Sequence, residues 1–115
     1  YSLENKTISA CGNHKKLIQN HELILFRICQ EFITNSLKYA QAQEISIYLN
    51  YKENHLEIYM ADNGIGFQQE ITKKGNGINN MNTRAKFIDA KLDLHSELKK
   101  GTQLHIIYNF NQNEI

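Results

Sequence analysis

Three polar side chains share one face of a long, otherwise apolar helical segment, within the stretch EFITNSLKY. Glu31, Asn35 and Lys38 are spaced four and three residues apart, so a helix presents them as one stripe. Asn disfavours a helix interior by roughly half a kcal/mol relative to Ala, because its amide competes for backbone hydrogen bonds. An amide oxygen can coordinate Mg²⁺, a lysine can attract a phosphate, and a carboxylate can accept a proton. The alternative is a solvated stripe without chemistry, which is the commoner case for a helix taken at random.

A carboxylate and two glycines end an alternating segment in the stretch ADNGIGF. Gly64 and Gly66 allow a sharp turn and a close approach of the backbone to a ligand. The carboxylate of Asp62 can accept a hydrogen bond from an exocyclic amine, which suits adenine. Asp-Asn-Gly also forms turns that merely end a strand, so this stretch alone leaves both interpretations open.

A second glycine pair, Gly75 and Gly77 in KGNGINNM, directly precedes a helical pattern. The first N–H groups of a helix and its positive dipole end form a ready anion site, and glycines let those amides wrap a phosphate. A GxG sequence before a helix is a weak signal, and a loop that binds nothing is equally compatible with it.

Hydrophobic periodicity predicts the elements that position these residues. A helix over residues 21–41, with Asn20 as its N-cap, carries an apolar stripe suited to lie on a sheet. Strict alternation predicts a hairpin over residues 44–61 with one covered face. A first strand is expected over residues 6–12, a second helix over 78–88, and a closing hairpin over 91–110. The fold class is therefore a two-layer α/β (α+β) sandwich, with a mostly antiparallel mixed sheet and helices on one face. The apolar stripe of the long helix comprises Leu25, Cys29, Phe32, Ile33, Ser36, Leu37 and Ala40.

Composition is that of one globular domain spanning residues 1–115, with 41% hydrophobic residues and a formal net charge of +1. This balance favours neither a nucleic acid nor a membrane surface as partner. No apolar run approaches the roughly 20 residues of a membrane helix, and no signal peptide opens the chain. The initial Tyr rather than Met predicts a fragment of a longer protein, which could carry a membrane anchor elsewhere. Cys11 and Cys29 are expected to be buried, reduced thiols.

Taken in order, QEFITNSLKYA, ADNGIGF, GNGINNM and KKGTQL resemble the asparagine motif, two glycine motifs and closing Gly-Thr motif of the GHKL ATPase superfamily. The resemblance spans roughly residues 23–110 and is closest to the catalytic ATP-binding domain of sensor histidine kinases. The short lid and the residues of the first motif resemble those of the subfamily with NarL-type response regulators. In that subfamily the first motif is commonly RxxQExxxNxxKHA. Tyr39 stands where this subfamily often has His.

The resemblance implies a Bergerat ATP-binding fold, ATP and Mg²⁺ as cofactors, and a role for each matching residue. Asn35 would coordinate Mg²⁺, Lys38 would contact the phosphates, and Glu31 would at most assist phosphoryl transfer as a catalytic acid or base. The implied partners are a dimerisation domain bearing the phospho-accepting His and a downstream response regulator. The implied location is the cytoplasm, and the resemblance is compatible with a parent protein anchored in the inner membrane. The implied nucleotide-binding set is Asn35, Lys38, Tyr39, Asp62, Gly64, Gly66, Gly75, Gly77 and Thr102.

Two alternatives to a histidine kinase domain share the fold. One is a Ser/Thr protein kinase of the anti-sigma-factor type, and the other is a degenerate module that docks a partner without turnover. His21, beside Glu22, resembles the acid-flanked acceptor of histidine kinases, but it lies only ten residues before Glu31 and is expected to be a solvated helix-start residue. His105 is expected on the exposed side of the sheet.

Overall fold

The computed structural model describes residues 5–13, 16–38, 41–65 and 76–110. Five strands and two helices lie within these ranges, and each predicted element is found with its boundaries shifted by at most a few residues. In chain order they are β1 (Asn5–Gly12), α1 (Gln19–Lys38), β2 (Glu44–Tyr51), β3 (His55–Asp62), α3 (Asn76–Phe87), β4 (Lys91–Glu97) and β5 (Gly101–Asn109).

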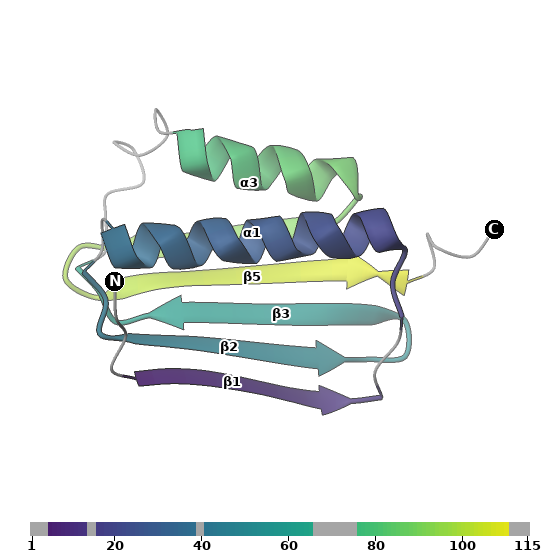
Figure 1. Ribbon diagram of the computed structural model, residues 1–115, viewed down its shortest axis with the longest axis horizontal. Coiled ribbons are helices and arrows are strands. Elements are labelled where there is room, and N and C mark those ends of the chain that lie inside the picture. Colours follow the sequence, from purple (N-terminus) through teal and green to yellow (C-terminus); the bar gives the residue numbers. More distant parts are fainter. Residues whose placement is uncertain (1–4, 14–15, 39–40, 66–75, 111–115) are drawn as a thin grey trace.

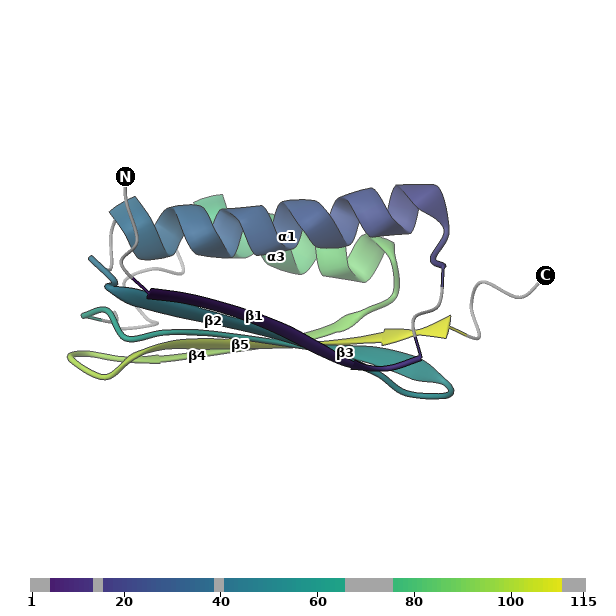
Figure 2. The same ribbon diagram turned by 60° about the horizontal axis from the view of Figure 1, so that its bottom comes forward.

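The strands form one mixed sheet in the order β1-β2-β3-β5-β4. β1 pairs with β2 in parallel, whereas β2 with β3, β3 with β5, and β4 with β5 are antiparallel. The two helices lie side by side over one face of the sheet, and no described element covers the other face (Figure 1 and Figure 2). The predicted two-layer sandwich is therefore confirmed.

The hydrophobic core lies between the helix layer and the sheet. Burial alternates along β3 and β5, as the period-2 pattern predicts. On α1, Ile28 is fully buried although the predicted stripe omits it, and the predicted Cys29 and Ile33 are only half-buried. The helix is thus rotated about its axis relative to the predicted stripe. The largest fully buried side chains are Tyr108, Ile28, Met60, Met81, Ile88, Leu104 and Ile106, together with the small Ser36.

The start of α1 differs from the prediction. The N–H of Glu22 already donates to the carbonyl of Ile18 (2.9 Å), so Asn20 lies in the first turn and the prediction that it is the N-cap is wrong. His21 is half-buried rather than solvated, because its Nδ1 lies 2.6 Å from the hydroxyl of the buried Tyr108. A buried phenol needs a hydrogen-bond partner, and the first turn of α1 supplies it.

Both cysteines are free thiols, but their surroundings differ. Cys29 is a partly buried residue of α1 that packs against the core, and burial raises the pKa of its thiol to about 11, which keeps it protonated and unreactive. Cys11 is exposed on β1, where its Sγ lies 2.7 Å from the hydroxyl of Tyr48. The expectation that both thiols are buried is therefore wrong for Cys11, because β1 turns that side chain to the uncovered face of the sheet.

The uncovered face carries a row of rings across the central strands. Register sets Tyr48 opposite Tyr59 and Tyr59 opposite His105, and the last two rings stack at 4.3 Å between centroids. Hydrogen bonds from Tyr59 and His55 lower the pKa of the Glu57 carboxyl below its ordinary value. His105 lies on this face, as its alternation predicts.

Gly101, at the start of β5, occupies a position that only glycine fits. Its φ of +90° lies in the left-handed region, and a Cβ there would sit 2.2 Å from the backbone oxygen of Asp62. We expect Gly101→Ala to lower the free energy of unfolding by about 3 kcal/mol, from strain and overlap together. Urea denaturation measures this, with the exposed neighbour Lys100→Ala expected within about 0.5 kcal/mol of wild type. An unchanged stability of Gly101→Ala would mean that β5 can move away from β3 at no cost.

Candidate functional site

Most of the predicted site residues that the structure describes lie toward one end of the sandwich. At this end, on the left in Figure 1, α1 and β3 finish while α3 and β5 begin. The register sets Asp62, the last residue of β3, opposite Thr102, the second residue of β5. Two motifs forty residues apart in the chain thus become neighbours through strand pairing.

Asp62 is a buried carboxylate held by three donors. Its Oδ1 accepts the backbone N–H of Gly64 (2.9 Å) and that of Thr102 (3.2 Å). Its Oδ2 accepts the hydroxyl of Ser36 on α1 (2.6 Å). Only 9% of the residue is exposed, so the orientation of the carboxylate is set by the protein rather than by water. The bond to Gly64 is the turn expected of Asp-Asn-Gly, and it coexists with the contacts to α1 and β5.

Ser36 contacts Asp62 but is absent from the site predicted from the sequence. It belongs to the predicted apolar stripe of α1, and its 1% exposure confirms that it is buried. A hydroxyl in such a stripe must find a hydrogen-bond partner, since a buried unpaired one costs roughly 1–3 kcal/mol. A serine directly after Asn35, among otherwise apolar core positions, was the available signal.

A pair of buried hydroxyls, those of Ser96 and Thr102, lies beside Asp62 in the sheet. Ser96 on β4 is opposite Thr102 on β5, and their hydroxyl oxygens are 2.8 Å apart. The Ser96 hydroxyl also donates to the carbonyl of Gly101 (3.2 Å). Both residues are buried, with 8% of Ser96 and 4% of Thr102 exposed. Buried polar side chains therefore continue from Asp62 through Thr102 to Ser96, toward the edge of the sheet.

The backbone that follows Asp62 is tied at two points. The side-chain oxygen of Asn63 accepts the N–H groups of Gln43 (3.0 Å) and Glu44 (2.8 Å), which fixes the turn against the start of β2. The carbonyl of Ile65 accepts the N–H of Lys99 from the turn between β4 and β5 (2.5 Å). Gly64 is buried between these ties, and Gly66 lies outside the described residues.

The predicted polar stripe occupies the C-terminal half of α1. Glu31 and Asn35 are half-buried, and Lys38 is exposed in the last turn. The Asn35 amide makes no hydrogen bond to another residue that the structure describes, so it remains available to a ligand. Asn35 precedes Ser36, the partner of Asp62, which ties this part of the stripe to the end of β3. Tyr39 lies outside the described residues.

The start of α3 lies at the same end of the sandwich (Figure 1). Gly77 belongs to its first turn, which contains no acidic residue to offset the positive end of the helix dipole. Gly75 lies outside the described residues. The anion site at the start of α3 therefore stays a prediction, because the loop before the helix lies outside the described residues.

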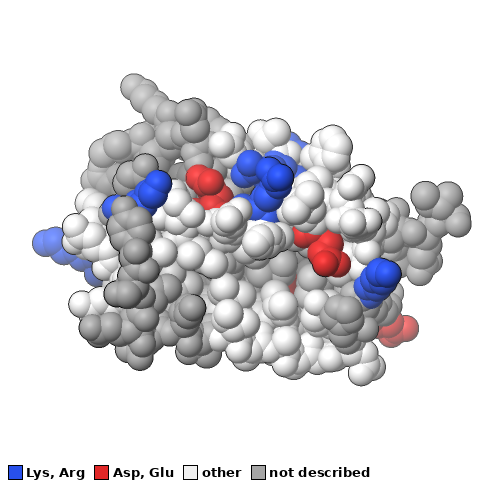
Figure 3. Space-filling view, in the orientation of Figure 1, with Lys and Arg blue, Asp and Glu red and all other residues white. Residues whose placement is uncertain are grey.

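Charge on the helix-bearing side is mixed. Figure 3 shows Lys and Arg interspersed with Asp and Glu rather than collected into one basic area. The described ranges contain no cluster of three His, Cys, Asp or Glu able to hold a metal ion, and no helix within them is long and apolar enough to cross a bilayer.

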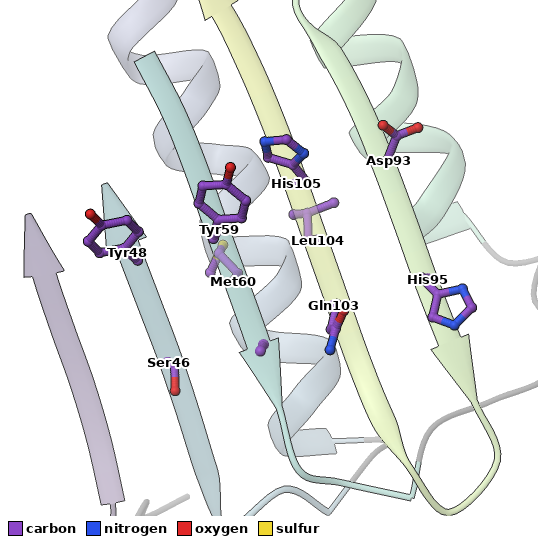
Figure 4. Close-up of a pocket in the computed structure, with 10 residues that line it drawn as sticks. Ser46, Tyr48, Tyr59, Met60, Asp93, His95, Gln103, Leu104 and His105 are labelled. Carbon is purple, nitrogen blue, oxygen red and sulfur yellow. The ribbon is translucent and has the colours of Figure 1, made fainter. Parts of the chain in front are cut away.

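A separate hollow of about 370 Å³ lies on the uncovered face of the sheet. Beside the row of rings, its lining includes Ser46, Gln103 and His95 (Figure 4). Ala61 lines it as well. None of the residues that the sequence predicted for a nucleotide lines it. The candidate site is therefore the end of the sandwich around Asp62, on the opposite face.

A protein-family model matches residues 20–112, described as histidine kinase-, DNA gyrase B-, and HSP90-like ATPase. The chain is 32% identical over 83 residues to the oxygen sensor histidine kinase NreB of Staphylococcus carnosus, covering 70% of this chain and 24% of that protein. It is 33% identical over 92 residues to the sensor histidine kinase LiaS of Bacillus subtilis, covering 79% and 25%. The sensor histidine kinase ComP of Bacillus subtilis is 31% identical over 88 residues, covering 74% and 11%. The chain thus spans about a quarter or less of the length of these relatives.

Solved structures have the same fold. The histidine kinase domain of a blue-light activated histidine kinase from Erythrobacter litoralis superposes with a TM-score of 0.73 over 93% of this chain and 52% of that one. The sequence identity is 16%, so this likeness concerns the arrangement of helices and strands.

Proposed function

The chain belongs to the family of histidine kinase-, DNA gyrase B- and HSP90-like ATPases, and on that premise we propose that it binds Mg²⁺-ATP and donates the γ-phosphoryl group to a histidine on a separate dimerisation domain. The phosphoryl group would then pass from that histidine to a response regulator. The domain would work in the cytoplasm, where ATP is available. The three named relatives are all sensor histidine kinases, which favours histidine over serine or threonine as the acceptor.

The observation that carries the proposal is the Asp62 carboxylate, fixed by Ser36, Gly64 and Thr102 at the end of β3. A buried carboxylate with its orientation set in advance offers an acceptor for one N–H donor of a ligand. The exocyclic amine of adenine supplies such a donor. Polar groups whose orientation is fixed before binding lower the entropic cost of binding a ligand.

The phosphate end of the ligand would lie along α1 and the start of α3. The Asn35 amide oxygen and Mg²⁺ are a chemically suitable pair, because Mg²⁺ in nucleotide sites takes one or two protein oxygens plus phosphates and water. When bound, Mg²⁺ would neutralise phosphate charge during transfer. Lys38 and the N–H groups of the first turn of α3 would add fixed positive charge, and positioning plus such charge is most of what phosphoryl transfer requires. Glu31, one turn before Asn35, would at most accept the proton released by the acceptor.

Incubating the chain with Mg²⁺ and ATP labelled at the γ-phosphate, together with the dimerisation domain of its parent protein, tests the proposal. We expect label on the acceptor that is lost in acid and retained in alkali, as a phosphohistidine is. Label that survives acid would instead support the Ser/Thr kinase alternative. ATP binding that calorimetry fails to detect, with no label transferred, would support a docking module and contradict the proposal.

A further inference from the structure

We propose that two buried serines, Ser36 and Ser96, make the Asp62 site select purines with an amino group at C6 over purines with an oxygen there. The inference rests on the proposed function, because it concerns which base that site accepts. Neither serine belongs to the set predicted from the sequence. Among the described residues, their effect is to fix where the hydroxyl protons of Ser36 and Thr102 point.

The protein leaves Asp62 with one open acceptor position. Each carboxylate oxygen has two lone pairs. Oδ1 uses both, on the N–H groups of Gly64 and Thr102. Oδ2 uses one on the hydroxyl of Ser36, at 2.6 Å. Because the single proton of Ser36 is committed to Asp62, the Ser36 oxygen can only accept from a ligand or from a bridging water.

Ser96 has the corresponding effect on Thr102. A carbonyl oxygen can only accept, so in the bond between Ser96 and Gly101 the serine donates its one proton. The Ser96 and Thr102 hydroxyls are nevertheless 2.8 Å apart. Both bonds can form together only if Thr102 donates to the Ser96 oxygen. The hydroxyl of Thr102 is then also left with lone pairs alone.

The polar row of Ser36, Asp62 and Thr102 consequently presents acceptors and no hydroxyl donor. An amino group at C6 brings donors to this row and is matched. An oxygen at C6 is itself an acceptor and would face the acceptor oxygens of these three residues. The C6 oxygen and the protein oxygens would then be buried without hydrogen-bond partners. Sites built on buried polar pairing reject such analogues strongly, because the unpaired groups remain buried.

The test compares ATP with inosine triphosphate, which differs from ATP in carrying oxygen at C6. We expect the wild-type chain to bind ATP at least about tenfold more tightly. In Ser96→Ala, Thr102 loses the oxygen that holds its proton and can turn to donate to O6. Affinity for inosine triphosphate should therefore rise, with ATP affinity little changed. The ratio of ATP affinity to inosine triphosphate affinity should fall about fivefold or more. A role of Ser96 in folding alone would weaken both nucleotides equally.

Three further variants complete the test. Ser96→Thr retains the hydroxyl and should keep the wild-type ratio, and Ser46→Ala, an exposed serine on the opposite face of the sheet, should also keep it. Ser36→Ala removes a hydroxyl oxygen that can only accept and would oppose an oxygen at C6, so it should also lower the ratio of ATP affinity to inosine triphosphate affinity, and it serves if Ser96→Ala fails to fold. Equal binding of the two nucleotides by wild type, or an unchanged ratio in the Ala variants, overturns the inference while the proposed function stands. If wild type binds neither nucleotide, the proposed function fails as well.

Discussion

Asp62→Asn is expected to weaken ATP binding at least about 100-fold while leaving the fold intact. The reason lies in which way the new carboxamide must face. The backbone N–H groups of Gly64 and Thr102 both point at Oδ1, so the amide oxygen of Asn must take that position. Its NH₂ group then replaces Oδ2. A donor would stand where the amino group of adenine needs an acceptor, and the negative charge would be gone as well.

The folded state should tolerate this exchange, because the Ser36 hydroxyl can turn and accept from the new NH₂ group. Calorimetric titration with ATP and Mg²⁺ measures the affinity, and thermal unfolding checks the fold. Asp93→Asn is the matched control, since Asp93 is an exposed carboxylate on the uncovered face and lies in no predicted contact with ATP. An Asp62→Asn variant that binds ATP as tightly as wild type would show that Asp62 does not receive the base.

The layout of the fold was predictable because period-2 and period-3.6 patterns report which side chains face a core. The alternation of residues 44–61 predicted both strands of the first hairpin, and burial alternates along β3 and along β2 as far as Leu49. The helix boundaries were less accurate. Asn20 has the chemistry of an N-cap, but the chain enters α1 earlier, where Tyr108 binds His21 in the first turn. Tertiary contacts of this kind leave no local signal in the sequence.

The candidate site was predictable where a residue type is unusual for its element, and not where it is ordinary. Asp62 ends a strand and Asn35 interrupts a helix, so both attract attention. Ser36 and Ser96 look like small, neutral residues, and their importance arises from pairing with residues 26 and 6 positions away. Strand register and helix placement decide such pairs, so only the three-dimensional arrangement exposes them.

Asn35→Ala is expected to separate stability from function. Ala favours a helix interior by roughly half a kcal/mol over Asn, and the Asn35 amide makes no hydrogen bond within the described part of the chain that would be lost. The free energy of unfolding of the nucleotide-free domain should therefore rise slightly. If Asn35 supplies an oxygen to Mg²⁺, the same change should remove the dependence of ATP affinity on Mg²⁺, an effect of about tenfold or more. A residue that costs stability and supports a ligand is what a functional position in a helix should look like.

Titrations with ATP in Mg²⁺ and in EDTA measure this dependence, and urea denaturation measures the stability. Gln30→Ala provides the control, because it also replaces an amide by Ala on α1 but at an exposed position on another face of the helix. Gln30→Ala should gain less stability, because Gln favours a helix more than Asn does, and it should keep the full Mg²⁺ dependence of ATP affinity. If Asn35→Ala also keeps the Mg²⁺ dependence of ATP affinity, other groups hold the metal. The polar stripe on α1 must then be explained by contacts with phosphate alone.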